Sequence, residues 1–192
     1  LAATYLPSQK ENRLTCADIT HRPQIIVEGN NAPTFLTQTL SMEEAPEEYS
    51  IATSTLHMGD TGLDCRFIAA TLSEGRYYLI LDAIFDNETK DDVVNWLADE
   101  MPDDMTFTVL RDHTLISVQG AGLPDDLWDH MPDMGHVFES ETHLYLRHGE
   151  TATDGMMITL DNNSAPAFWE KLVKRKDVTP MGVHQYEEKR RA

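Results

Sequence analysis

One pattern occurs twice in this sequence: a short apolar strand that breaks at a glycine and leads through small or polar residues into a helix. The first copy, ADITHRPQIIVEGNNAPTFL, has its strand at Ile25–Val27 and its break at Gly29. The second copy, LISVQGAGLPDDLW, has its strand at Leu115–Val118, its break at Gly120, and Pro124 opening the expected helix. Glycine suits both elbows because a side chain would crowd a sharp turn from strand to helix. The repeat indicates internal duplication.

Hydrophobic periodicity extends the same plan through both halves of the chain. In the first half, 49–56, 63–72 and GRYYLILDAI are typical of strands, followed by a helix at TKDDVVNWLADEM and a strand at MTFTVLRD. In the second half, HVFESE, THLYLRHG and MMITLD are typical of strands, and SAPAFWEKLVKRK of a helix. Thr89 and Ser164 are the expected N-caps of the two helices. Phe168, Leu172 and Trp169 form the expected apolar face of the second one.

The order of these elements predicts an α+β fold built from two similar lobes, each running strand, helix, antiparallel strands, helix. We expect an irregular segment at 1–16, a first lobe at 17–112 and a second lobe at 113–192. Residues 17–192 are expected to form one compact unit.

The charge of the chain limits its partners. A net charge of −18 over 192 residues argues against binding to nucleic acid or to anionic membranes. No apolar run approaches the roughly 18 residues of a membrane span. Seven of the fifteen basic groups lie near the end of the chain: Lys171, Lys174, Arg175, Lys176, Lys189, Arg190 and Arg191. They are either ordinary groups near helix C-termini or a positive end that receives an anionic ligand. Two cysteines without a CxxC motif favour a reduced, cytoplasmic setting.

Five segments carry a family resemblance: DITHRPQIIVEGNNAPTFL, TGLDCRFIAATLSEGRYYLILDA, LISVQGAG, LRHGETATDGMMI and MGVHQYEEKRR. In this order they resemble segments of the T-protein of the glycine cleavage system, a tetrahydrofolate-dependent aminomethyltransferase. The resemblance begins near Ala17. It implies the two-lobe folate-binding body of that fold, without the C-terminal barrel domain. It also implies transfer of a one-carbon unit from an aminomethyl-lipoyl carrier protein to tetrahydrofolate.

Carried over position by position, the resemblance implies roles for four residues. With one residue inserted near Leu72, Asp64 falls at the catalytic Asp beside the folate nitrogen that accepts the one-carbon unit. A carboxylate there can orient an amine and stabilise developing positive charge. Asp82 falls at an Asn that contacts the pterin, Thr153 at the Glu that anchors the pterin, and Arg190 at an Arg of the folate site. The resemblance implies no metal ligand.

Departures from the family pattern leave further hypotheses open. Cys65 replaces the second Asp of a pair, and Glu150 stands at a Tyr near the pterin. Thr153 cannot accept the paired N–H donors that a carboxylate accepts. One alternative is therefore a non-catalytic subunit or diverged scaffold of the same fold, completed by a partner subunit or by the C-terminal domain. A folate-dependent demethylase is a second alternative.

Other combinations of residues are weaker candidates for a site. Four histidines within a short span suggest a metal site, although alternating-strand geometry favours surface positions: His130, His136, His143 and His148. Asp18, Thr20 and His21 contain the groups of a nucleophilic triad but lack a Gly-x-Ser-x-Gly elbow. Cys16 and Cys65 have no evident activating partner and are expected to be buried thiols.

Overall fold

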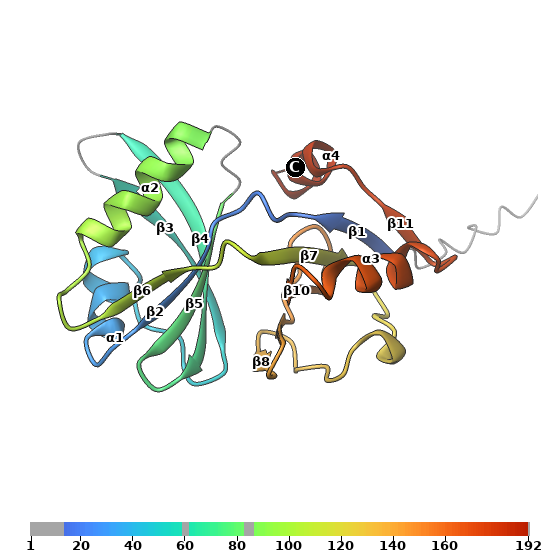
Figure 1. Ribbon diagram of the computed structural model, residues 1–192, viewed down its shortest axis with the longest axis horizontal. Helices are drawn as coiled ribbons and strands as arrows, with labels where there is room; N and C mark the ends of the chain where they lie inside the picture. Colours follow the sequence, from blue (N-terminus) through green and yellow to red (C-terminus); the bar gives the residue numbers. More distant parts are fainter. Residues whose placement is uncertain (1–13, 59–61, 83–86, 192) are drawn as a thin grey trace, which may run out of the picture.

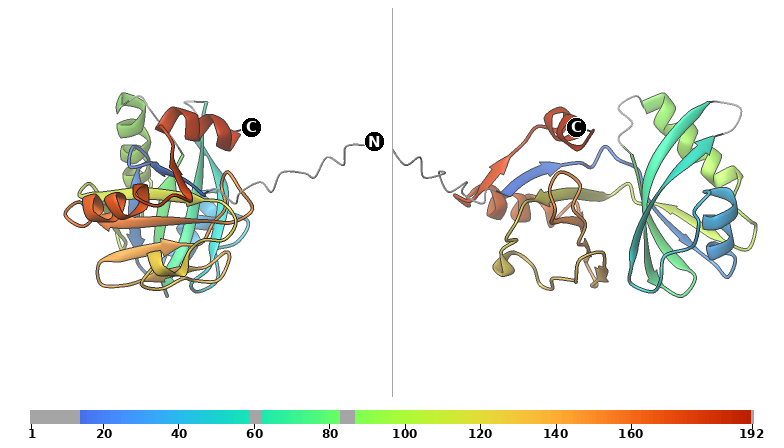
Figure 2. Two further views of the ribbon diagram at one scale, coloured as in Figure 1. Left: turned by 90° about the vertical axis from the view of Figure 1, so that its right-hand side faces the viewer. Right: turned by 180° about the vertical axis from the view of Figure 1, so that it is seen from behind.

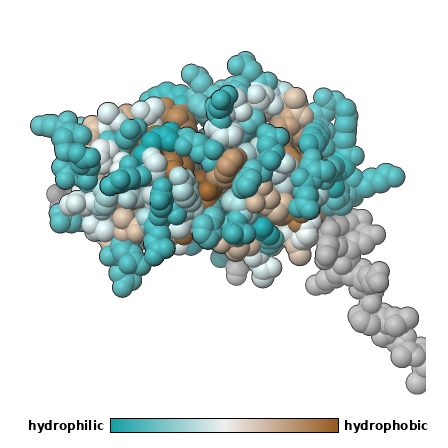
Figure 3. Space-filling model, turned by 90° about the horizontal axis from the view of Figure 1, so that it is seen from below, coloured by the Kyte–Doolittle hydropathy of each residue, from teal (hydrophilic) through white to brown (hydrophobic). Residues whose placement is uncertain are grey.

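The computed structural model describes residues 14–58, 62–82 and 87–191, and in that part the chain forms two β-sheets with helices packed against them (Figure 1). The expected α+β class is confirmed. Within the described ranges, no helix is long and apolar enough to cross a membrane. Hydrophilic residues cover most of the face seen from below (Figure 3), as suits a chain with a net charge of −18.

The first sheet is antiparallel, with the strand order β3-β4-β5-β2-β6. Its strands are β2 (Gln24–Glu28), β3 (Ile51–Met58), β4 (Leu63–Ser73), β5 (Arg76–Leu81) and β6 (Thr106–Val109). Its outer face is covered by α1 (Ala32–Thr34), which continues as a π-helical turn at Phe35–Thr39, and by α2 (Asn87–Asp99) (Figures 1 and 2). Leu36, Leu79 and Leu97 meet in the buried core between these layers.

The second sheet has the strand order β11-β1-β7-β10-β9-β8. Its strands are β1 (Leu14–Asp18), β7 (His113–Gln119), β8 (Val137–Glu139), β9 (His143–Leu146), β10 (Gly155–Asp161) and β11 (Val178–Pro180). β1 and β11 are parallel, and the other pairs are antiparallel. α3 (Ala165–Val173) packs on this sheet through Leu172, with Phe168 and Trp169 partly buried beside it, so the predicted apolar face is confirmed.

The inner faces of the two sheets pack against each other. Ile68 and Tyr78 of the first sheet share a buried cluster with Met157 of the second. The Tyr78 hydroxyl donates to Oε1 of Gln24 (2.7 Å) and lies 2.7 Å from Oγ1 of Thr159, in the second sheet. These three buried polar side chains therefore satisfy one another, as burial requires.

The duplicated elbows are present, but the second one does not lead into a full helix. Gly29 has φ +152° and Gly120 has φ +140°, values that favour glycine. After Gly29 the chain enters α1 as expected. After Gly120 only a 3₁₀ turn forms, at Asp125–Leu127. The backbone returns to an extended conformation at Trp128 (φ −115°, ψ 139°), so the helix stops after this turn.

Of the two predicted N-caps, Ser164 has the expected position and Thr89 does not. α2 begins at Asn87, so Thr89 lies inside its first turn. Ser164 occupies the N-cap position of α3 but makes no capping bond. Its hydroxyl donates to Oδ2 of Asp161 (2.6 Å), and Oδ1 of Asp161 accepts the N–H groups of Asn163 and Ser164. The Asp161 carboxylate therefore organises the turn that leads into α3.

The chain changes sheets early. β1 lies beside β7 and β11 in the second sheet, and β2 follows after a short segment in the first. The last helix, α4 (Val183–Arg191), lies above β1 on the side facing the first sheet (Figure 1). Both features bring distant parts of the sequence to the junction of the sheets. The predicted lobe boundaries at 17–112 and 113–192 stay a prediction.

Candidate functional site

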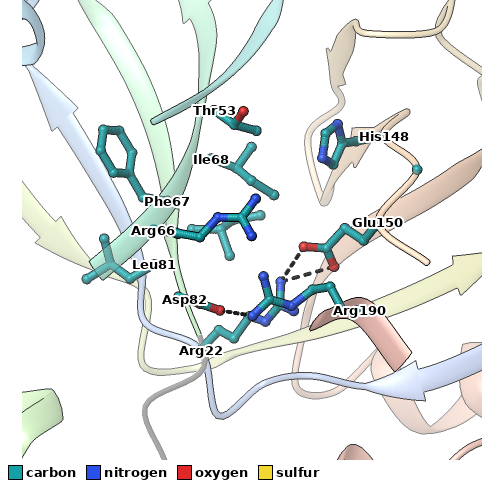
Figure 4. Close-up of a pocket in the computed structure, with 12 residues that line it drawn as sticks. Arg22, Thr53, Arg66, Phe67, Ile68, Leu81, Asp82, His148, Glu150 and Arg190 are labelled. Atoms are coloured by element: carbon teal, nitrogen blue, oxygen red, sulfur yellow. Dashed lines mark hydrogen bonds and ion pairs between the residues drawn. The ribbon is translucent and has the colours of Figure 1, made fainter. Parts of the chain in front are cut away.

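A cleft of about 220 Å³ lies at the junction of the two sheets (Figure 4). One wall comes from Arg66–Ile68 of β4 and from the end of β5 at Ile80–Asp82. The opposite wall comes from the loop after β9, at 148–150, and from Arg190 of α4. Arg22, in the segment that joins β1 to β2, lies at the bottom of the cleft as drawn in Figure 4.

Arg22 is a buried guanidinium held by two carboxylates. Its side chain is 2% exposed. Nη1 donates to both oxygens of Glu150 (2.8 and 3.1 Å), while Nε and Nη2 donate to Oε1 of Glu187 (3.0 and 2.9 Å). Glu150 and Glu187 are themselves buried, at 6% and 3% exposure. A buried charge is tolerable only when it is paired in this way, so Arg22 fixes the cleft loop and α4 in one arrangement.

The network continues from Glu187 to the first sheet. Nε of Arg190 donates to Oε2 of Glu187 (2.9 Å), and Nη2 of Arg190 pairs with Oδ1 of Asp82. Burial alone would raise the pKa of Glu187. The hydrogen bond from His21, the charge of Arg22 and the bonds from Arg190 and Arg22 outweigh burial and lower that pKa from 4.5 to about 2. Glu187 is therefore ionised at neutral pH.

A second chain of hydrogen bonds supports Glu150 from the second sheet. The Tyr186 hydroxyl donates to Oε2 of Glu150 (2.6 Å) and lies 2.7 Å from the Ser117 hydroxyl. Nε2 of Gln119 donates to Oγ of Ser117 (2.9 Å), and Oε1 of Gln119 accepts from the backbone N–H of Glu150 (2.7 Å). Burial, and then the charge of Glu150, raise the pKa of Tyr186. The tyrosine remains a neutral donor, and the cleft loop is rigidly held.

The open part of the cleft carries Arg66, His148 and Thr53. Arg66 is exposed, and its guanidinium makes no ion pair or hydrogen bond with any residue that the structure describes. Burial lowers the pKa of His148; the charge of Glu150 opposes the change, and Arg22 and Arg66 add to it. His148 is therefore predominantly neutral at pH 7.

The structure brings together two of the four residues singled out from the sequence. Asp82 and Arg190 line the cleft and pair with each other. Asp64, on β4, is 67% exposed and lies 2.8 Å from Nδ1 of His57, outside this cleft. Thr153 is exposed in the loop before β10 and does not line the cleft. The ligand-binding and catalytic roles of all four remain predictions. β4 does hold one extra residue relative to β5, in a bulge between Thr71 and Ser73.

Sequence reasoning missed Arg22, Arg66 and Glu187. Arg66 had a readable signal, because it lies between the apolar residues Cys65 and Phe67, and alternation along a strand places it on the face opposite to theirs. Arg22 and Glu187 had none, because only the folded chain brings β1, the cleft loop and α4 together.

The weaker candidates do not assemble into sites. Thr20 donates to Asp18 (2.6 Å), whereas His21 lies 3.4 Å from Glu187, so the three groups do not form a triad. Among the residues that the structure describes, no three His, Cys, Asp or Glu side chains are grouped to hold a metal. The two thiols are buried as expected. Burial raises the pKa of Cys16 to about 11 and also raises that of Cys65.

Sequence comparison finds two similar curated proteins, and no family model matches the chain. They are aminomethyltransferases from Nitrosomonas eutropha and Nitrosomonas europaea, 31% and 29% identical. Each match covers 58% of this chain and 33% of the relative. The chain thus spans about a third of the length of the curated relatives that it matches.

A solved structure has the same fold. The glycine cleavage system aminomethyltransferase T from Bartonella henselae matches with a TM-score of 0.77 at 24% identity, over 94% of this chain and 51% of that chain. The predicted resemblance is therefore confirmed: the chain is similar in sequence to aminomethyltransferases and has the α+β fold of the glycine cleavage T-protein.

Proposed function

We propose that this chain forms the folate-binding part of a tetrahydrofolate-dependent aminomethyltransferase that acts in cytoplasmic one-carbon metabolism. The observation that carries the proposal is the cleft at the junction of the sheets. Asp82 and Arg190, which the family resemblance assigns to the folate site, both line it and bond to each other. The similarity to aminomethyltransferases supports the same reading.

The residues of the cleft suit part of a folate. A pterin is a flat ring whose N–H groups need acceptors, and a carboxylate offers about four acceptor sites. Asp82 can therefore accept from a pterin while it pairs with Arg190. A volume of about 220 Å³ is below the roughly 300 Å³ at which typical ligand pockets begin. The cleft would admit the ring, and the rest of the folate would extend out of it.

In the proposed reaction, a methylene group moves from an aminomethyl-lipoyl carrier protein to two folate nitrogens, and ammonia and the carrier thiol leave. The chain would contribute by orientation, because holding two reactants in register supplies much of such a rate enhancement. Asp82 and Arg190 would fix the ring. The predicted role of Asp64, which is to orient the accepting amine, stays separate from this arrangement, because Asp64 lies outside the cleft.

A non-catalytic subunit of the same fold is the second candidate. It is favoured by the two carboxylates that line the cleft, Asp82 and Glu150, because each already pairs with an arginine of the chain. The exposed position of Asp64 points the same way. A folate-dependent demethylase would share the folate requirement of the first candidate.

Calorimetric titration with tetrahydrofolate tests the proposal. We expect the wild-type chain to bind tetrahydrofolate saturably with a micromolar dissociation constant, which corresponds to about −8 kcal/mol. Asp82→Asn should bind tetrahydrofolate at least tenfold more weakly. Asp99→Asn, on the exposed end of α2, is the matched control and should bind as the wild type does. Asp64→Ala should keep binding but lose aminomethyl transfer from a lipoyl carrier. If millimolar folate produced no heat of binding and no thermal stabilisation, the folate function would be rejected and the non-catalytic subunit favoured.

A further inference from the structure

We infer that Arg66 makes the open side of the cleft a receptor for an oxyanion, a carboxylate or phosphate group carried by the ligand. The inference rests on the proposed function only in taking this cleft as the ligand site. Alternation along β4 turns Cys65 and Phe67 into the core of the first sheet and leaves Arg66 and Ile68 facing the cleft. Figure 4 shows the Arg66 guanidinium extending from the β4 wall toward the side that carries His148 and Glu150.

Arg66 differs from the other two arginines of the cleft. Arg22 holds Glu150 and Glu187, and Arg190 holds Asp82 and Glu187. These pairs neutralise the carboxylates of the cleft within the protein. Arg66 has no such partner among the described residues, although the chain carries thirty-three acidic groups against fifteen basic ones. The cleft therefore keeps one uncompensated cation, placed where a ligand would enter.

The chemistry of a guanidinium specifies the class of ligand. Its planar fork of N–H groups matches the two oxygens of a carboxylate or phosphate, and the bonds are strengthened by charge. Two neighbouring groups on the cleft wall can add donors: the neutral imidazole of His148 and the hydroxyl of Thr53. Neither side chain has a hydrogen-bond partner among the residues described here. Ile68 and Ile80 supply the apolar wall beside them, which lowers the local dielectric and favours the pairing of charges.

Small anions test the receptor without assuming a folate. Citrate and inorganic phosphate should each raise the melting temperature of the wild-type chain in a saturable way, with at least tenfold weaker binding to Arg66→Gln. Arg111→Gln is the matched control. This substitution removes the same charge from a residue that is also exposed but does not line the cleft. It should bind the anions as the wild type does. Because Arg66 is exposed, its substitution should leave the ligand-free melting temperature unchanged. Equal responses in all three proteins, or no response in any, would overturn the inference.

A second comparison identifies the source of the oxyanion. Tetrahydrofolate carries glutamyl carboxylates, whereas 6-methyltetrahydropterin has the ring alone. If the carboxylates reach Arg66, the wild type should bind tetrahydrofolate at least tenfold more tightly than the pterin, and Arg66→Gln should bind both equally. Equal binding of tetrahydrofolate by wild type and Arg66→Gln would overturn the inference while the proposed function stands. If citrate and phosphate bound in a way that depends on Arg66, but neither tetrahydrofolate nor 6-methyltetrahydropterin bound, the oxyanion site would be supported and the folate function rejected.

Discussion

Replacing Arg22 by Met is the sharpest test of how the cleft is held together. Met keeps much of the apolar stem but removes the guanidinium that donates to Glu150 and Glu187. All three side chains are at most 6% exposed. Removing one partner of a buried ion pair costs about 3–5 kcal/mol, because the remaining charge stays buried without its counter-ion. We expect a loss of unfolding free energy in this range at pH 7.

The same change should have a defined pH dependence. The pKa of Glu187 is lowered from 4.5 to about 2 in the folded chain, a shift worth about 3 kcal/mol, shared among His21, Arg22 and Arg190. Because the folded pKa lies below the unfolded value, this stability is present in full above pH 4.5 and is lost as the pH falls toward 2. The difference between wild type and Arg22→Met should therefore shrink over that window.

Urea denaturation at pH 7, 5 and 3.5 measures both quantities. Arg175→Met is the matched control, since Arg175 makes similar pairs with Asp126 and Asp177, whose side chains are 69% and 47% exposed. Surface pairs are worth about 0–1 kcal/mol, so the control should unfold almost as the wild type does. If Arg22→Met were no more destabilised than Arg175→Met, or if its deficit were the same at every pH, the account of a buried ion network would be wrong.

Three further predictions concern the junction and the core. Tyr78→Phe should lower the unfolding free energy by about 1–2 kcal/mol, measured by urea denaturation, because the hydrogen bonds that Tyr78 makes to Gln24 and Thr159 are buried. Gly155→Ala should lower the melting temperature, with a cost of about 1–3 kcal/mol, because a methyl group there would overlap the bonded Gln119 amide. Cys16 should not react with a disulfide reagent at pH 8 until urea unfolds the chain, because burial raises the pKa of its thiol to about 11.

The fold class was predictable from the sequence because periodicity records local burial. The strand predicted at 63–72 and the helix predicted at TKDDVVNWLADEM each led to an observed element. The helix expected after Pro124 was wrong, because the backbone is extended again at Trp128. A proline indicates where a helix can begin, but not how long it will be. The start of one helix was also misplaced, because α2 begins at Asn87, two residues before the predicted cap Thr89.

The site was less predictable because its residues come from six segments of the chain. Family resemblance pointed to Asp82 and Arg190, which do line one cleft. It pointed equally to Asp64 and Thr153, which lie outside that cleft. No local pattern indicates that Arg22 pairs with Glu150, a residue far along the chain. Such a pair depends on the packing of the two sheets, and packing is a property of the whole fold.

The position of β1 has a consequence for how the chain folds during synthesis. β1 ends at Asp18, and its first neighbour in the sheet, β7, begins only at His113. At a translation rate of roughly 5–20 residues per second, several seconds or more pass between the synthesis of β1 and that of β7. During this time the backbone donors and acceptors of β1 lack their partners in β7. The strands of the first sheet, which pair among themselves, are complete before β7 appears. We therefore expect the first lobe to fold co-translationally. We also expect β1 to be the segment that a nascent-chain chaperone most needs to shield.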